Sequence, residues 1–238
     1  ASAQTLGAFG ETINNGTIVA GESRVETSIV GAYAQQTFGL NDKIYITGAA
    51  RVDGSSVYGA DNRWQFFPKV SVAYVISDED FWANSKMGDL FSLLKLRAAW
   101  GQSGNLTAIG TYQRFALYNP VSYGGVTGYV ADPAMGNLNL LPERQIELEV
   151  GVDLSMFKDR LSAEFTWFSK DVEDLLLNRT LAPSTGFVNR VLNIGTMTNK
   201  GFEFLVRGIP VQNKNVTWVT TVNYTNNKNT VDGVEGNG

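Results

Sequence analysis

The sequence predicts an all-β protein in which antiparallel strands form the wall of a transmembrane β-barrel. Glycine supplies 25 of the 238 residues, and many runs alternate between apolar and polar side chains, as strands do when their two faces meet different surroundings. Several of these runs exceed the length of about 9–11 residues that a tilted strand needs to cross a bilayer. Short and long connections alternate along the chain, as they do in outer-membrane barrels. A soluble β-sandwich is the alternative, because its core also requires an apolar face.

Composition excludes several classes of function. The chain has no cysteine and no histidine, so thiol nucleophiles, Ser–His triads and Cys or His metal sites are ruled out. The net charge of −4 argues against a nucleic-acid partner. Residues 1–20 lack the basic start and apolar core of a signal peptide, and no stretch reaches the roughly 20 apolar residues of a transmembrane helix. We therefore expect no catalytic residues, no metal and no cofactor.

Eight stretches are predicted strands. They are 24–38, 43–53, 64–77, 91–103, 143–156, 160–173, 200–210 and 215–228. Three of the links between them are short, and three are long and rich in Gly, Asn, Pro and Thr, the long ones being 54–63, 104–142 and 174–199. In an up-and-down sheet, this alternation places tight turns at one end and long loops at the other.

The first half of the chain separates its faces unevenly. In the hairpin 24–53 both faces are mixed, and the sequence leaves open which one points outward. Arg51 and Asp53 share a face near the long-loop end, where we predict an ion pair that steadies the strand; a ligand contact is the alternative. Ser77 and Asp80 have the spacing of a capping box and predict a short helix within 77–90. We interpret the acidic residues 78–80 as the solvated start of that helix rather than a metal site.

The second half alternates more strictly. A four-residue turn at 157–160 sets Met156 opposite Leu161. The same register brings every aliphatic residue of strand 143–156 onto one face with its partners on strand 160–173, whereas a slip of one residue would scatter them. The last hairpin has the same pattern, with Phe202 and Phe204 on one strand and Trp218 and Tyr224 on the other.

These alternations predict two surroundings. Lipid covers the apolar face and water fills the lumen along the polar face. The residues predicted to face lipid are Val150, Val152, Leu154, Phe165, Trp167 and Trp218. The residues predicted to face the lumen are Glu147, Glu149, Asp153, Glu164, Lys95 and Arg97.

Four stretches resemble the SusC/RagA family of TonB-linked outer-membrane transporters. They are "RVDGSSVYGADNRWQFFPKVSVAYVISDEDFW" (51–82), "LLKLRAAWGQSGNLTAIGTY" (93–112), "NLNLLPERQIELEVGVDLSMFKDRLSAEFTWFSKDVEDLL" (137–176) and "LNIGTMTNKGFEFLV" (192–206). They occur in the family's order. The resemblance implies a barrel of about 22 strands with an internal plug, of which residues 1–238 would be a partial barrel domain without the plug or the TonB box. A complete small barrel of eight strands is the alternative.

The resemblance also implies a function and partners. The family imports oligosaccharides or peptides across the outer membrane, with a SusD-like surface lipoprotein and the TonB complex as partners. TonB would act through regions outside this chain.

Two groups of side chains are candidates for substrate contact. Tyrosine rings stack on sugars and are common in recognition surfaces, and the long loop 104–142 holds Tyr112, Tyr118, Tyr123 and Tyr129; loop packing or contact with the lipoprotein is the alternative. Glu147 and Glu149 lie about 6.6–6.8 Å apart along their strand, a separation that suits a glycosidase pair. We interpret them instead as part of a hydrated wall, because a catalytic pair also needs a shaped pocket.

Overall fold

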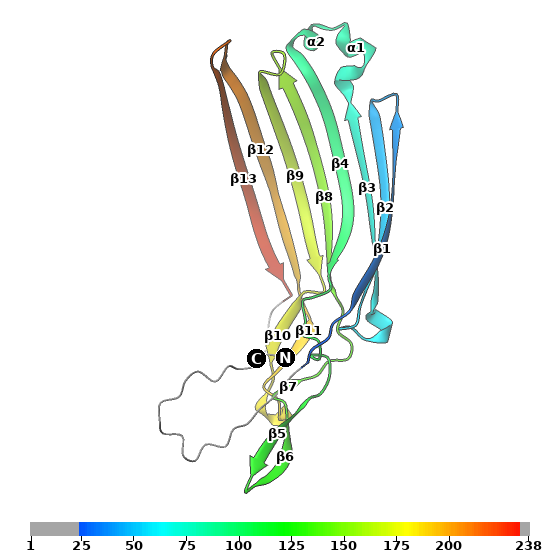
Figure 1. Ribbon diagram of the computed structural model, residues 1–238, viewed down its shortest axis with the longest axis vertical. Coiled ribbons are helices and arrows are strands. Elements are labelled where there is room, and N and C mark those ends of the chain that lie inside the picture. The colour runs from blue at the N-terminus through cyan, green and yellow to red at the C-terminus, as the bar shows by residue number, and fades with distance from the viewer. Residues whose placement is uncertain (1–23, 234–238) are drawn as a thin grey trace.

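The computed structural model describes residues 24–233, which form one long antiparallel sheet with smaller elements gathered at one end (Figure 1). Eight strands pair in the order β1-β2-β3-β4-β8-β9-β12-β13. Their bounds are Ile29–Leu40 (β1), Ile44–Ser55 (β2), Trp64–Val75 (β3), Phe91–Asn105 (β4), Glu143–Met156 (β8), Leu161–Glu173 (β9), Thr196–Gln212 (β12) and Thr217–Asp232 (β13). Each long strand pairs with the next long strand along the chain, so the sheet is a simple meander.

The sheet is open. Over the part of the chain that the structure describes, β1 and β13 stand at the two edges and do not pair with each other. The eight strands therefore do not close into a small barrel, and the alternative of a complete eight-stranded barrel is wrong for this arrangement. An open sheet with unpaired edges is what a segment of a larger barrel presents.

All eight predicted strands are present, and their register follows the predicted pattern. Met156 pairs with Leu161, and the pairing continues through Val152 with Phe165 to Val150 with Trp167. The turn that sets this register runs through three consecutive residues with positive φ, 157–159. Each strand is 12 to 17 residues long, which is ample for a tilted crossing of a bilayer.

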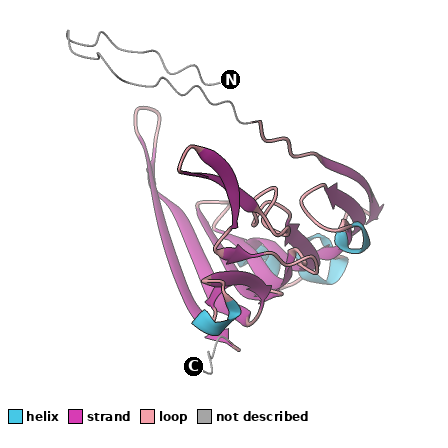
Figure 2. Cartoon of the chain, turned by 90° about the horizontal axis from the view of Figure 1, so that it is seen from below, coloured by secondary structure: helices cyan, strands magenta, loops and turns pink. Residues whose placement is uncertain are grey.

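The predicted asymmetry of the two ends is also observed. Figure 1 shows the short turns at the upper end of the sheet and the long connections at the lower end. The long connections contain strands that the sequence did not predict, namely β5 (Tyr118–Tyr123), β6 (Val126–Ala131), β7 (Ala134–Met135), β10 (Leu176–Thr180) and β11 (Asn189–Asn193). Strands β5 and β6 form a hairpin, and β10, β11 and β7 form a second small sheet. Figure 2, seen from below, shows these small strands in front of the long ones.

The helical elements are short. They are η1 (Ala60–Asn62), η2 (Ile76–Asp78), α1 (Asp80–Ala83), α2 (Lys86–Leu90) and η3 (Pro183–Thr185). The predicted short helix within 77–90 is present, but the predicted capping box is wrong, because Glu79 is the N-cap of α1 and makes no side-chain cap. Ser85 caps α2 instead, with its hydroxyl accepting from the Gly88 amide at 3.3 Å. Within residues 24–233, none of the helices combines the length and the apolarity needed to cross a membrane.

The buried core lies at the loop end and not between two layers of sheet. Val57, Tyr58, Leu106, Ile109 and Leu140 form one cluster of buried side chains, against which two partly buried residues of the small sheet pack. Tyr58 is fully buried, and its hydroxyl donates to the Asn105 carbonyl at 3.3 Å. This cluster anchors the long loops to the lower ends of the strands.

Candidate functional site

The pairing register divides the long sheet into a polar face and an apolar face. Residues that are directly opposite in an antiparallel pair point to the same side. Lys95 pairs with Asp153, and Asp153 pairs with Glu164. Glu147 pairs with Gly101, and Glu149 pairs with Ala99. Gly101 and Ala99 point to the same side of β4 as Lys95 and Arg97, because every second residue of a strand shares a side. The structure therefore brings all six residues predicted to face the lumen onto one face.

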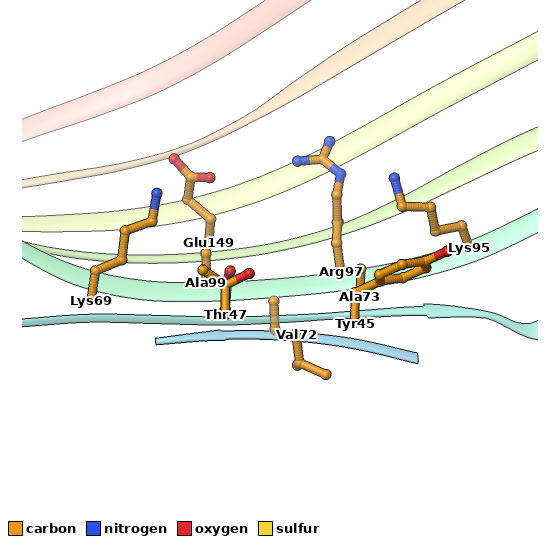
Figure 3. Close-up of a pocket in the computed structure, with 12 residues that line it drawn as sticks. Tyr45, Thr47, Lys69, Val72, Ala73, Lys95, Arg97, Ala99 and Glu149 are labelled. Carbon is orange, nitrogen blue, oxygen red and sulfur yellow. The ribbon is translucent and has the colours of Figure 1, made fainter. Parts of the chain in front are cut away.

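Figure 3 shows this division directly. Lys69, Lys95, Arg97 and Glu149 project to one side of the sheet, whereas Val72 projects to the other. Hollows in the sheet surface are lined mainly by residues of the polar face. The polar face is thus the hollowed side of the wall.

The apolar face is exposed and continuous. The six residues predicted to face lipid share it. On β8 and β9, Val150 pairs with Trp167, Val152 with Phe165 and Leu154 with Ala163. Phe165 also pairs with Phe204 of β12, and Phe204 pairs with Tyr224 of β13, which points to the same side as Trp218 on that strand. Val150 is 46% exposed and Trp218 57%. A sandwich would bury these side chains under a second sheet, so the sandwich alternative is wrong.

The structure also resolves the first hairpin. Phe38 pairs with Ile46 and Ile46 with Val72, which places both on the apolar face. Tyr33 pairs with Arg51 on the polar face. The apolar band therefore extends from β13 to β1, across the whole described sheet.

Arg97 forms a bridge across three strands of the polar face. Its Nε donates to Asp153 Oδ1 at 3.0 Å, and one terminal nitrogen donates to Thr166 Oγ1 at 2.6 Å. The side chain passes over Gly151, where a Cβ would lie 2.8 Å from the guanidinium carbon. Lys95 Nζ lies 3.2 Å from the second carboxylate oxygen of Asp153. Two cations thus meet at one carboxylate in the middle of the wall.

Carboxylates dominate the neighbouring hollow. Glu147, Glu149, Glu164 and Glu203 line it together with Arg97, whose guanidinium is already hydrogen-bonded to Asp153. The hollow is open to solvent along the sheet and does not enclose a substrate-sized cleft. The structure shows Glu147 and Glu149 beside an open hollow and not in the shaped pocket that a glycosidase pair requires, and their place in a hydrated wall stays a prediction.

The structure separates the four loop tyrosines. Tyr118 pairs with Ala131 and Pro120 with Tyr129, so Tyr118 and Tyr129 share one face of the β5–β6 hairpin. Tyr123 pairs with Val126 and points to the opposite face, and Tyr112 lies in the turn before the hairpin. Tyr118 is 67% exposed and Tyr129 72%. Two of the four predicted contact residues thus lie exposed on one face of the β5–β6 hairpin.

Asparagine side chains that sequence reasoning missed tie the long loops together. The Asn193 amide nitrogen donates to the carbonyls of Leu141 and Asp174, each at 2.8 Å, and its oxygen accepts from the Leu141 amide at 2.9 Å. Asn137 is buried and donates to the Val191 carbonyl at 3.0 Å. The only signal in the sequence is the density of asparagine in the two long links, which by itself indicates loops and no particular contact.

Two predicted features lie near the strand ends. The Arg51–Asp53 ion pair is confirmed, with Arg51 Nε 2.6 Å from a carboxylate oxygen of Asp53, which is buried. Residues 78–80 do form the start of a helix, with Asp78 and Asp80 exposed and Glu79 as the N-cap of α1. Glu79 in addition lies 2.9 Å from Lys43 Nζ and accepts from the Tyr74 hydroxyl at 3.1 Å, contacts that were not predicted. Two hydrogen bonds lower the pKa of Glu79, of which the one from Lys43 has the larger effect and the one from the Tyr74 hydroxyl the smaller.

Comparison with known proteins gives a consistent family. A family model described as TonB dependent receptor-like, beta-barrel, matches residues 3–238. The chain is 37% identical over 200 residues to the TonB-dependent receptor P39 of Formosa agariphila and 27% identical over 216 residues to the TonB-dependent receptor SusC of Bacteroides thetaiotaomicron. These matches cover 84% and 88% of the chain.

Solved structures agree with the sheet. The structure of the RagAB peptide transporter superposes with a TM-score of 0.80 at 25% identity and covers 87% of the chain. The siderophore receptor PirA of Pseudomonas aeruginosa, at 17% identity and a TM-score of 0.54, shares the fold. The chain spans only a small part of these proteins, 19% of receptor P39, 21% of SusC and 22% of the RagAB transporter chain.

Proposed function

The chain belongs to the TonB dependent receptor-like β-barrel family, and from this premise we propose that it forms part of the barrel wall of an importer of oligosaccharides or peptides. The chain is an outer-membrane β-barrel segment, and it spans about a fifth of the length of the curated relatives it matches. Uptake by the whole protein rests on the family and on the two-sided sheet. Residues 1–238 would then be a partial barrel domain, with the plug and the TonB contact in other parts of the receptor.

The division of the sheet into two faces is the observation that supports this proposal most. The apolar band that includes Val150 and Trp167 faces hydrocarbon, where exposed apolar side chains are stable. The polar face that includes Lys95, Arg97 and Glu149 lines the water-filled interior. A wall with hydrated charges on one side and apolar side chains on the other suits passage of a polar solute past the inner face.

A matched pair of adjacent substitutions tests the assignment of the faces. In the full-length receptor, Val150→Lys places a charge on the lipid side, which costs about 2–4 kcal/mol near the bilayer midplane. Glu149→Lys places the same charge on the lumen side. We expect much less folded receptor in the membrane for the first variant and near-normal levels for the second, measured by heat-modifiable mobility on gels. Equal levels for the two variants would contradict the assignment.

The long-loop end is the proposed site of contact with substrate and lipoprotein. The related RagAB protein is a peptide transporter, and the resemblance of the sequence to SusC/RagA proteins adds oligosaccharides and a SusD-like lid. Tyr118 and Tyr129 offer two exposed rings on one face of a hairpin that extends beyond the sheet (Figure 1). Such rings stack on sugars or on peptide side chains.

Uptake assays test this contact. In cells that express the full-length receptor with its lipoprotein, we expect the double variant Tyr118→Ala/Tyr129→Ala to reduce uptake of a labelled oligosaccharide or peptide severalfold. Tyr123→Ala, on the opposite face of the same hairpin, is the matched control. If all the variants take up both classes of solute as the parent does, these rings do not contact the substrate or the lid.

A further inference from the structure

The segment that joins β3 to β4 at the short-turn end exposes large apolar side chains. Phe81 is 65% exposed, Met87 49% and Leu90 40%. All three lie within the eleven residues that contain α1 and α2, above the ends of β3 and β4 in Figure 1. Exposed charged residues alternate with them, namely Asp78, Asp80, Lys86 and Asp89. The segment therefore exposes apolar and charged side chains together.

Contacts with two strands place this segment on the apolar side of the sheet. Tyr74 belongs to the apolar face, since it pairs with Ile44 and Leu96, and its hydroxyl donates to Glu79. Phe91 pairs with Met156 on the same face. The ring of Phe91 lies edge-on to that of Trp82 with centroids 6.4 Å apart. The segment is therefore held by Tyr74 and Phe91, which belong to the apolar face.

An ion pair fixes the segment to a third position. Lys43, in the turn between β1 and β2, lies 2.9 Å from Glu79, and both side chains are about a quarter exposed. The Trp82 indole also donates to the Phe91 carbonyl at 3.4 Å. With contacts to the β1–β2 turn, to β3 and to β4, the segment has a fixed position at the edge of the apolar band.

We propose that residues 80–90 form an interfacial anchor that inserts Phe81, Met87 and Leu90 among the phospholipids at the short-turn end of the barrel. The occupant is lipid because Tyr74, which holds the segment through Glu79, belongs to the apolar face, and this inference rests on the proposed function, in which that face lies against hydrocarbon. Trp82 then lies at the level of the aromatic girdle, where indole rings are favoured. The anchor adds a membrane contact made by residues outside the strands, and it would fix how deep the short-turn end lies in the bilayer.

Site-specific fluorescence tests the anchor, and the absence of cysteine from this chain makes single labels practical. A full-length receptor without other cysteines carries an environment-sensitive probe at Phe81→Cys and is reconstituted into phosphatidylethanolamine–phosphatidylglycerol vesicles. Met87→Cys is the second labelled position, in case the first variant fails to assemble. Lys214→Cys is the matched control, because it lies in the exposed turn between β12 and β13 at the same end.

Quenching by spin-labelled lipid and by aqueous iodide gives the result. We expect the probe at residue 81 or 87 to be quenched by lipid roughly threefold more than the probe at residue 214, with the reverse order for iodide. Equal quenching at the anchor and control positions would overturn the proposal. Substrate uptake does not enter this measurement, so failure of the anchor is distinguishable from failure of the proposed transport function.

Discussion

Substituting Gly151 by alanine is expected to uncouple the charged bridge in the middle of the wall. A Cβ at this position would lie 2.8 Å from two atoms of the Arg97 guanidinium group and 3.0 Å from the Phe165 carbonyl oxygen. The Arg97 side chain would have to leave its path over β8. It would then lose its hydrogen bonds to Asp153 and Thr166, which measure 3.0 and 2.6 Å.

The size of the effect follows from these contacts. Hydrogen bonds to charged groups contribute about 1.5–3 kcal/mol each, and exposed ion pairs contribute less than about 1 kcal/mol. Because the Arg97 side chain is 32% exposed and that of Asp153 18%, we assign about 2 kcal/mol to the bridge. Crowding against the backbone oxygen of Phe165 adds roughly 1 kcal/mol. Gly151→Ala should therefore lower the free energy of unfolding by about 3 kcal/mol in total.

A double-mutant cycle measures the coupling. The free energy of unfolding is obtained by urea titration of the full-length receptor in detergent micelles for the parent, Gly151→Ala, Arg97→Ala and the double variant. In the Arg97→Ala background, the glycine substitution should cost only the backbone part, so the coupling energy should be about 2 kcal/mol. Gly48→Ala is the control, because a Cβ there has no neighbour within 4 Å. An equal cost of Gly151→Ala with and without Arg97 would refute the bridge.

Three further predictions concern residues outside the membrane-spanning strands. Asn193→Ala should remove about 1–3 kcal/mol of local stability and speed amide exchange in the long loops while leaving exchange in the strands unchanged, as measured by hydrogen–deuterium exchange. The pKa of Glu79 is lowered from 4.5, chiefly by the hydrogen bond from Lys43, so its stabilising effect is present above pH 4.5 and is lost as pH falls through the folded-state pKa. The protection factors of the amides in residues 76–90, which correct for the intrinsic pH dependence of exchange, should therefore fall in acid, and in Lys43→Met they should already be low at neutral pH; protection factors that do not change with pH in the parent would contradict this. Burial raises the pKa of Tyr58 to about 12 from 10.0, so stability should fall between these two pH values, and the difference in phenolate absorbance between the parent and Tyr58→Phe should appear near pH 12 and not near pH 10.

Local pattern was sufficient to predict the long strands and their faces. In the hairpin of β8 and β9, the turn at 157–160 and the alternation of side chains determine which residues pair, and both lie within about thirty residues of chain. The same alternation predicts that Lys95, Asp153 and Glu164 share one face. The mixed alternation of the first hairpin did not decide its faces, because Tyr33 and Phe38 both resemble outward-facing residues and only pairing with β2 and β3 separates them.

Sequence alone determined the strands, their alternation and the asymmetry of the two ends, because these depend on neighbours in the chain. Tertiary structure decided what depends on distant segments. Strand β7 pairs with β11, more than fifty residues later, and Asn193 joins loops that the sequence keeps apart. Tyr74 contacts Glu79 and Phe91 contacts Trp82, and these contacts of the segment between β3 and β4 could not be read from any periodicity in so short a segment. Non-local contacts of this kind depend on how the sheet brings segments from distant parts of the chain together, and the order of residues within a single segment does not determine them.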